Sequence, residues 1–194
     1  SSLGLTGTIV EKMCWVQSAD TLIVVQEDLP PVKIIRGAGD NNWTASAISF
    51  DSVPKYNFVP AASNPAGTIT PSAVAGNVTI TASSGVFSAS HVGQYINASP
   101  QGRAKIVQRV SSTVVNVITE FPFFNTSAIG SGSWELETGY ESVWSATRGY
   151  PRTVTFHEGR LFFGGSKTRP STVWGSKVGL FFDFDPEEGL DDDA

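Results

Sequence analysis

Short runs of β-branched residues, separated by glycine, proline and small polar residues, constrain the fold of this chain more than any other feature. The runs are TLIVVQ, VKIIR, NVTITA and TVVNVITEF. Such runs favour strands, and the 19 glycines and 11 prolines supply turns. Charged residues make up 16% of the chain, below the quarter or so that is typical of a globular domain. Ser, Thr, Asn and Gly must therefore build much of the surface, and we predict an all-β protein.

The composition changes along the chain and indicates two modules. Residues 51–75 are rich in Pro, Ala, Ser and Gly with weak periodicity, which is typical of a crossing linker. We expect 1–54 and 139–194 to form one discontinuous β-domain of propeller-blade-like antiparallel meanders. We expect 55–138 to form a small β-barrel or sandwich inserted into it.

Turn chemistry predicts the connections in the first domain. SAD at 18–20 and the pair Glu158–Gly159 are expected to form tight turns. EDLPP at 27–31 is expected to be a loop, because two successive prolines remove two backbone donors and do not suit a central strand.

The middle block is expected to contain a hairpin and one short helical turn. Residues 103–110 and 113–121 have similar lengths and are separated by a Ser-Ser pair, which predicts that they pair. Ser88 is expected to cap a single helical turn that Gly93 closes.

The two ends of the chain carry the same pattern. TLIVVQEDLPPVKIIR and RLFFGGSKTRPSTVWG both contain a strand-like run, a polar stretch ending in proline, and a second run. Leu22 and Pro31 have the same spacing as Leu161 and Pro170. Repeated three-stranded units are typical of propeller blades. A complete propeller needs more blades, and the chain starts SSLGLTG without an initiator Met, so we expect a part of something larger.

Charge and hydropathy exclude some functions. The net charge of -5 argues against a protein that grips nucleic acid by neutralising phosphates. No apolar run is long enough to span a bilayer, and no signal peptide is visible. Cys14 is the single cysteine, so no intrachain disulfide can form, and we expect it to be a buried small apolar residue.

The residues that could form a catalytic group lie near the C-terminal end and are His157, Glu158 and Arg160. A catalytic interpretation makes His157 a base oriented by Glu158. Adjacent side chains of a strand point to opposite faces, so the two would not converge unless the turn bends them, and we expect a strand-end histidine and an exposed turn glutamate. Gly164 and Gly165 precede no helix, which a phosphate loop requires, and are expected to mark a close backbone approach.

The C-terminus holds the densest run of carboxylates. These are Asp183, Asp185, Glu187, Glu188, Asp191, Asp192 and Asp193. Their spacing does not match an EF-hand. We expect a solvated acidic terminus, with a loose calcium site as the alternative.

Aromatic residues offer one further possible ligand surface. The five tryptophans are Trp15, Trp43, Trp134, Trp144 and Trp174. All lie in or beside predicted strands, so we expect them to pack in cores, with a sugar-binding platform as the alternative. His91 is expected to lie on the surface of the one-turn helix rather than to bind a ligand.

No catalytic, cofactor-binding or metal-binding residue is assigned, and no cofactor is expected. An enzymatic alternative is a propeller glycosidase, which needs two carboxylates flanking one cleft. Pairing Glu158 with Glu135 or Glu137 is the one arrangement that the sequence offers for it.

Long stretches of the chain resemble the tail tubular protein B, or nozzle, family of short-tailed bacteriophages. They are WVQSADTLIVVQEDLPPVKIIRGAGDNNWTASAISF followed by Pro54, and WSATRGYPRTVTFHEGRLFFGGSKTRPSTVWGSKVGLFFDF. The second contains GYPR, TFHEGRL, FGG, RP and Trp-Gly-Ser, which resemble the recurrent blade of these proteins. The block with VTITASSGVFSASHVGQYI is similar to a small β-domain often inserted between such blades.

The resemblance implies a structural virion protein of the tail, assembled in the host bacterial cytoplasm, with no membrane anchor. Copies would form a ring below the portal and adaptor, contact tail-fibre proteins, and let DNA pass without specific binding. The family has no catalytic residues to transfer, and its proteins are several times longer, so ring-forming segments are expected outside this chain. The alternative is that the inserted domain, rich in Thr, Ser and aromatics, binds a host glycan or a tail-fibre partner.

Overall fold

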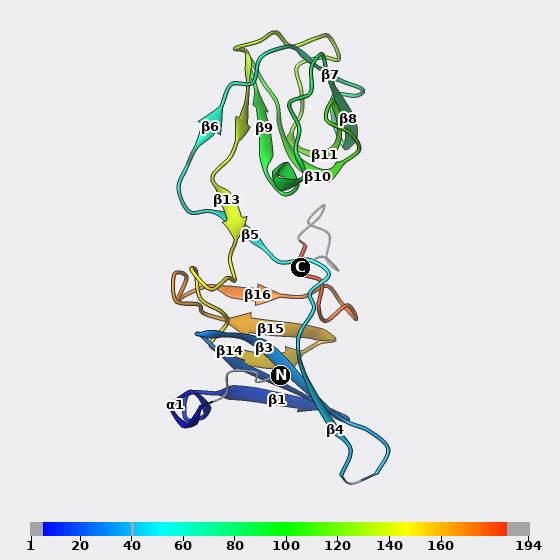
Figure 1. Ribbon diagram of the computed structural model, residues 1–194. Coiled ribbons are helices and arrows are strands. Elements are labelled where there is room, and N and C mark those ends of the chain that lie inside the picture. The colour runs from blue at the N-terminus through cyan, green and yellow to red at the C-terminus, as the bar shows by residue number, and fades with distance from the viewer. Residues whose placement is uncertain (1–5, 40, 186–194) are drawn as a thin grey trace. The chain divides into compact units, whose positions relative to one another are not determined.

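The computed structural model describes residues 6–39 and 41–185 (Figure 1). The strands of its three larger sheets pair in antiparallel fashion, which confirms the predicted all-β class. The chain divides into two compact units, Ser1–Pro54 with Ser142–Ala194, and Lys55–Glu141. We call them the flanking unit and the inserted unit. The sequence places the end of the insertion at residue 138, whereas the contacts of the structure place it at Glu141.

The flanking unit contains a four-stranded meander with the order β1-β2-β3-β4. Its strands are β1 (Cys14–Ser18), β2 (Thr21–Gln26), β3 (Leu29–Arg36) and β4 (Trp43–Ala47), and the short helix α1 (Gly7–Val10) precedes them. The expected turn at Ala19 and Asp20 is confirmed, with Ala19 at a φ of 49°. Of the described helices, none is both long enough and apolar enough to cross a bilayer.

The loop expected at 27–31 is wrong in its second half. The turn consists of Glu27 and Asp28, and both prolines lie inside β3, a central strand between β2 and β4. The sheet tolerates them because the β2–β3 register shifts between Val24 and Gln26. Residues in a β-bulge lie outside the hydrogen-bonded ladder, so a proline there does not need the backbone N–H that it lacks. Toward β4, Pro31 acts only as an acceptor, for the amide of Ile48.

A second meander follows the insertion, with the order β14-β15-β16. Its strands are β14 (Thr153–His157), β15 (Arg160–Gly164) and β16 (Val173–Gly175). Glu158 and Gly159 form the expected turn with φ angles of 46° and 75°, the signs that a type I′ hairpin turn requires.

An aromatic cluster forms the core of the flanking unit. The ring of Phe50 lies 5.2 Å from Trp144 and 6.0 Å from Phe163, and Phe163 stacks on Phe184 at 5.4 Å. The four-stranded sheet meets this cluster through Lys33, whose Nζ lies 5.5 Å from the ring of Phe182.

Polar contacts join the two meanders of the flanking unit. Strands β1 and β14 lie beside each other. The Arg152 guanidinium forms an ion pair of 2.5 Å with the Glu27 carboxylate, and the Tyr150 amide donates to the Glu27 carbonyl. The turn after β2 is thus fixed to the segment that leads into β14.

The inserted unit consists of one seven-stranded sheet with the order β6-β12-β9-β10-β11-β8-β7. Its strands are β6 (Ala62–Ser63), β7 (Ile69–Pro71), β8 (Asn77–Ala82), β9 (Tyr95–Ala98), β10 (Arg103–Arg109), β11 (Val114–Phe121) and β12 (Trp134–Glu137). The predicted hairpin is confirmed as β10 and β11. The helical turn is η1 (Ala89–His91), capped by Ser88 and followed by Gly93 at a φ of 83°. Where the chain passes between the units, β5 (Lys55–Asn57) and β13 (Tyr140–Ser142) form a two-stranded sheet.

The core of the inserted unit lies on one face of this sheet. Alternate residues of neighbouring strands form buried rows, such as Ile106, Val117 and Val78, as the two-residue period of a strand requires. The edges of the sheet approach each other, because Ile69 of β7 exchanges two backbone hydrogen bonds with Ile129 in the connection before β12. The Trp134 indole also donates to the Gly67 carbonyl.

The barrel detail of the prediction is not seen, since β6 and β7, the two edge strands of this sheet, do not pair with each other. The interpretation of 51–75 as a crossing linker is also wrong in part. That segment supplies β5, β6 and β7, and Ile69 is fully buried in the core. Its small residues and prolines obscure the strand pattern because edge strands are short.

Candidate functional site

The candidate catalytic residues lie on an exposed turn. His157 ends β14, and Glu158 occupies the turn that follows. The strand-end histidine and the exposed turn glutamate are as expected, and the left-handed turn bends their side chains together, with His157 Nε2 3.7 Å from Glu158 Oε1. Both side chains are largely exposed, and Arg160 points elsewhere, donating to the Ser176 carbonyl. This arrangement is an exposed ion pair when the histidine is protonated.

Gly165 marks a close backbone approach, as expected, whereas Gly164 is approached by the side chain of Thr153. A Cβ at Gly164 would lie 2.4 Å from Thr153 Oγ1, and one at Gly165 would lie 2.9 Å from the Pro170 carbonyl oxygen. The Gly165 amide donates to the Thr172 carbonyl. That amide therefore already has a partner and does not point toward an open phosphate cradle.

The acidic C-terminus lies mostly outside the described residues, which end at Asp185. Asp183 forms an ion pair of 3.3 Å with Lys177 and accepts a hydrogen bond from the Asp185 amide. Within 6–39 and 41–185, no group of three or more His, Cys, Asp or Glu residues could hold a metal ion. The calcium alternative for Glu187, Glu188 and Asp191–Asp193 falls outside the described residues.

Cys14, expected to be buried, and His91, expected on the surface, are both half-buried. Cys14 is only half-buried, because β1 is an edge strand. His91 is also half-buried, and its Nδ1 accepts a hydrogen bond from the Ser88 amide at the helix start. Burial and the nearby Lys55 charge lower the pKa of His91. It acts as part of a cap.

The tryptophans separate into two groups. Trp134 and Trp144 are buried, as expected, and Trp174 is half-buried. Trp15 and Trp43 are exceptions, with 63% and 57% of their surface exposed. The expectation that all five pack in cores is therefore wrong for these two.

Both exposed tryptophans lie on the same face of the four-stranded sheet. The strand register places Trp15 beside Val24 and Val32, and Trp43 beside Arg36. We call this surface the tryptophan face; its members are Trp15, Leu22, Val24, Val32, Ile34 and Trp43. Lys33, which meets the aromatic core, points to the opposite face. On the tryptophan face, Val32 is buried and Leu22, Val24 and Ile34 are half-buried, so its exposed part consists of Trp15 and Trp43.

The second meander buries the face that matches the tryptophan face. When the two hairpins are aligned at their turns, Leu22 corresponds to Leu161 and Val24 to Phe163, because each occupies the same position after a two-residue turn. Leu161 and Phe163 are fully buried, whereas Leu22 and Val24 are only half-buried. The same side of the same motif is fully buried in one hairpin and only partly buried in the other.

The inserted unit carries a polar cluster that the sequence analysis did not identify. Arg103 forms ion pairs with Glu120 and Glu137, and its guanidinium lies 3.7 Å from the centre of the Tyr95 ring. Its Nη2 also donates to the Tyr140 hydroxyl at 3.0 Å. The residues come from four strands plus β13, so only pairing brings them together. No short motif could have revealed them.

The electrostatics of this cluster hold its charges in place. Burial favours the neutral form of Glu137, but hydrogen bonds from Arg103 and Asn97 outweigh it and lower the pKa of the carboxyl. Burial disfavours charged Arg103, yet Glu137 and Glu120 raise its pKa overall. Burial, together with Glu120, raises the pKa of Tyr95. The geometry suits a structural network, because Glu137 is a partnered carboxylate rather than a proton donor.

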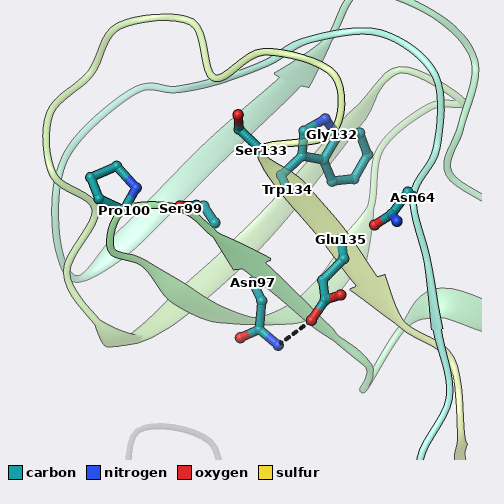
Figure 2. Close-up of a pocket in the computed structure, with 9 residues that line it drawn as sticks. Asn64, Asn97, Ser99, Pro100, Gly132, Ser133, Trp134 and Glu135 are labelled. Carbon is teal, nitrogen blue, oxygen red and sulfur yellow. Dashed lines mark hydrogen bonds between the residues drawn. The ribbon is translucent and has the colours of Figure 1, made fainter.

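Two open hollows adjoin each other on the inserted unit. One, of about 320 Å³, is shown in Figure 2. The second, of about 220 Å³, shares the lining residues Ser99, Pro100 and Ser133 with it. In Figure 2, Asn64 and Asn97 lie on either side of Glu135, which matches the strand order β6-β12-β9.

The glycosidase pairing gains no support from these positions. Glu158 belongs to the flanking unit, whereas Glu135 and Glu137 belong to the inserted unit. Glu137 is held in its ion pair with Arg103.

Comparison with models of known protein families finds no match for this chain, and comparison with curated proteins also finds none.

Proposed function

We propose that this chain is a structural component of a bacteriophage tail tube or nozzle, in which copies associate through their blade-like sheets. The role is architectural rather than catalytic. The single observation that carries the proposal is the tryptophan face. A sheet face on which two tryptophans are more than half exposed is the kind of surface that marks a protein–protein contact.

The packing inside the flanking unit suggests what covers this face. The first meander contributes its Lys33 side to the aromatic core, while the second contributes the side that carries Leu161 and Phe163. By the hairpin alignment, these are opposite sides of the same motif. The two meanders therefore pack head to tail, and head-to-tail contacts continue into rings or filaments.

The partner surface is the outward side of the second meander in another copy. Phe162, Thr155 and Val173 lie on that side, and Val173 is 69% exposed. This side corresponds to the Lys33 side of the first meander, which the core already covers. Burying Trp15 and Trp43 would contribute on the order of 5 kcal/mol before the entropy of association is subtracted.

The charge and the family resemblance support the same role. The net charge of -5 disfavours phosphate binding, so DNA could pass a ring of such chains without being held. The portal, adaptor and tail-fibre proteins are the further partners that the resemblance implies, and the virion tail is the proposed location. Tight retention of duplex DNA at physiological salt would contradict this role.

Association can be tested with two matched variants, one on each surface. We expect Trp15→Ser/Trp43→Ser and Val173→Glu each to lower the oligomeric state measured by sedimentation velocity. Mixing the two variants should restore a dimer, because each retains the surface that the other lacks. Phe121→Ser, which changes an exposed aromatic of the inserted unit, is the control and should associate as the parent does.

Two results would overturn the proposal. One is a parent chain that stays monomeric at high concentration. The other is association that survives both variants. A pair of variants that fail to complement each other would contradict the head-to-tail arrangement.

A further inference from the structure

The two adjoining hollows of the inserted unit form one largely polar surface. Three residues line both hollows: Ser99 and Pro100, which follow β9, and Ser133, which precedes β12. The Ser99 amide donates to the Ser133 carbonyl at 2.7 Å. Backbone pairing thus fixes the centre of the surface.

The residues that line the hollows offer uncharged hydrogen-bond donors and acceptors at several separate positions. Besides serines, it contains Asn64, Asn97, Gln101 and Asn125. The Asn125 side-chain oxygen accepts from the Ser127 amide, which leaves its nitrogen as a donor. Gln101 Nε2 donates to the Pro122 carbonyl, which leaves its oxygen as an acceptor.

Glu135 is the one charged residue among those that line the hollows. Its Oε1 accepts a long hydrogen bond of 3.5 Å from Asn97 (Figure 2). A carboxylate has about four acceptor positions, so it can accept further bonds from ligand hydroxyls. The absence of Lys and Arg from this lining disfavours phosphate or sulfate groups.

An exposed aromatic ring stands at the end of this surface. Phe124 lines the second hollow and is 68% exposed, while the neighbouring Phe123 is buried in the core. An exposed ring beside amides and a carboxylate suits a ligand with one apolar face and many hydroxyls. Neutral oligosaccharides have that chemistry, and two adjoining hollows offer places for more than one sugar unit.

We infer that these hollows bind a neutral oligosaccharide, with Phe124 stacking on a sugar ring and Glu135 accepting from its hydroxyls. This inference is independent of association through the tryptophan face, which belongs to the other unit. The hollows are open and shallow for a ligand site, so each copy binds weakly. Several copies in one assembly would raise the overall affinity through multivalency.

Saturation-transfer NMR with neutral hexasaccharides tests the inference. The probes are the hexamers of glucose, galactose, mannose and N-acetylglucosamine, each added to the whole chain. We expect transfer to at least one hexamer, with a dissociation constant of about 1 mM or lower. A sulfated hexasaccharide should show no transfer at this site.

Matched phenylalanine variants locate the binding. Phe124→Ala should weaken binding at least tenfold, whereas Phe121→Ala, which removes a ring that is 62% exposed but lines neither hollow, should leave it unchanged. Glu135→Gln retains the shape and should also weaken binding. Dispersed amide NMR spectra show that each variant is folded.

The inference is overturned if no neutral hexamer shows transfer. It is also overturned if Phe124→Ala and Phe121→Ala bind alike, or if only the sulfated probe binds. Because the association test uses variants of the other unit, its failure is distinguishable from a failure here.

Discussion

The two units use their apolar surface in different ways. The inserted unit covers the apolar face of its single sheet by bringing the sheet edges together through Ile69 and Ile129. The flanking unit packs one side of its four-stranded sheet against an aromatic cluster and leaves Trp15 and Trp43 of the tryptophan face more than half exposed. A unit that closes on itself needs no partner, whereas a stack of sheets always has an uncovered outer side. This difference is the basis on which we propose assembly through the flanking unit.

The largest expected effect comes from removing the centre of the aromatic cluster. Phe163 is fully buried and contacts the rings of Phe50, Trp144 and Phe184. Phe163→Ala should destabilise the flanking unit by about 3–5 kcal/mol. Urea unfolding followed by amide NMR should show the loss in the flanking unit, with the signals of the inserted unit retained.

The reciprocal change is Leu136→Ala in the inserted unit. Leu136 is almost fully buried in the core of the seven-stranded sheet, so the variant should lose about 2–5 kcal/mol from that unit alone. If either variant unfolds both units together, the division into two self-supporting bodies is contradicted.

A smaller, pH-dependent effect is expected from the Arg103 cluster. The pKa of Glu137 is lowered in the folded protein, so its carboxylate stabilises the fold above the unfolded-state pKa of about 4.3. That contribution is lost as the pH falls through the lower folded-state pKa. Glu137→Gln should therefore cost about 1 kcal/mol near neutral pH, and the difference from the parent should disappear in acid.

Urea unfolding of parent and variant across this pH range provides the measurement. Glu158→Gln, at an exposed turn of the flanking unit, is the matched control and should show no such convergence. If Glu137→Gln still lowers the free energy of unfolding in acid, then packing, not charge, explains the contribution of Glu137 to stability.

The smallest effect is expected at the two-residue turns that occupy corresponding positions in the two hairpins. Glu158 has a φ of 46°, which is unfavourable for a glutamate but suits asparagine. Glu158→Asn should stabilise the flanking unit by about 0.5–1 kcal/mol, measured as a shift of its thermal midpoint. Ala19→Asn at the corresponding turn, with a φ of 49°, should shift it in the same direction. Opposite shifts would show that the turns are not equivalent.

Features with local causes were predictable. The turn at Glu158 and Gly159, the pairing of β10 with β11, and the cap at Ser88 all follow from residues adjacent in the chain. Each depends on backbone preferences and side-chain period, which act over a few residues.

Features that depend on a neighbouring strand were not predictable. The two prolines of β3 are accommodated by a register shift against β2. Arg103 meets Glu120 and Glu137 only because β10, β11 and β12 belong to one sheet. The hollows arise in the same way, from segments that begin and end on β9 and β12.

The sequence by itself determined that this chain is all-β, because its short β-branched runs and frequent turn residues leave no helical period to follow. Only the tertiary structure decided which tryptophans are buried. Trp15 and Trp134 both lie in strands, and the pattern around each suits a core. Trp134 is covered because its sheet curls and Gly67 accepts its indole hydrogen. Trp15 is exposed because its sheet has a second apolar side that no described segment fully covers. Burial depends on the number of layers that pack together, and strand period alone does not specify that number.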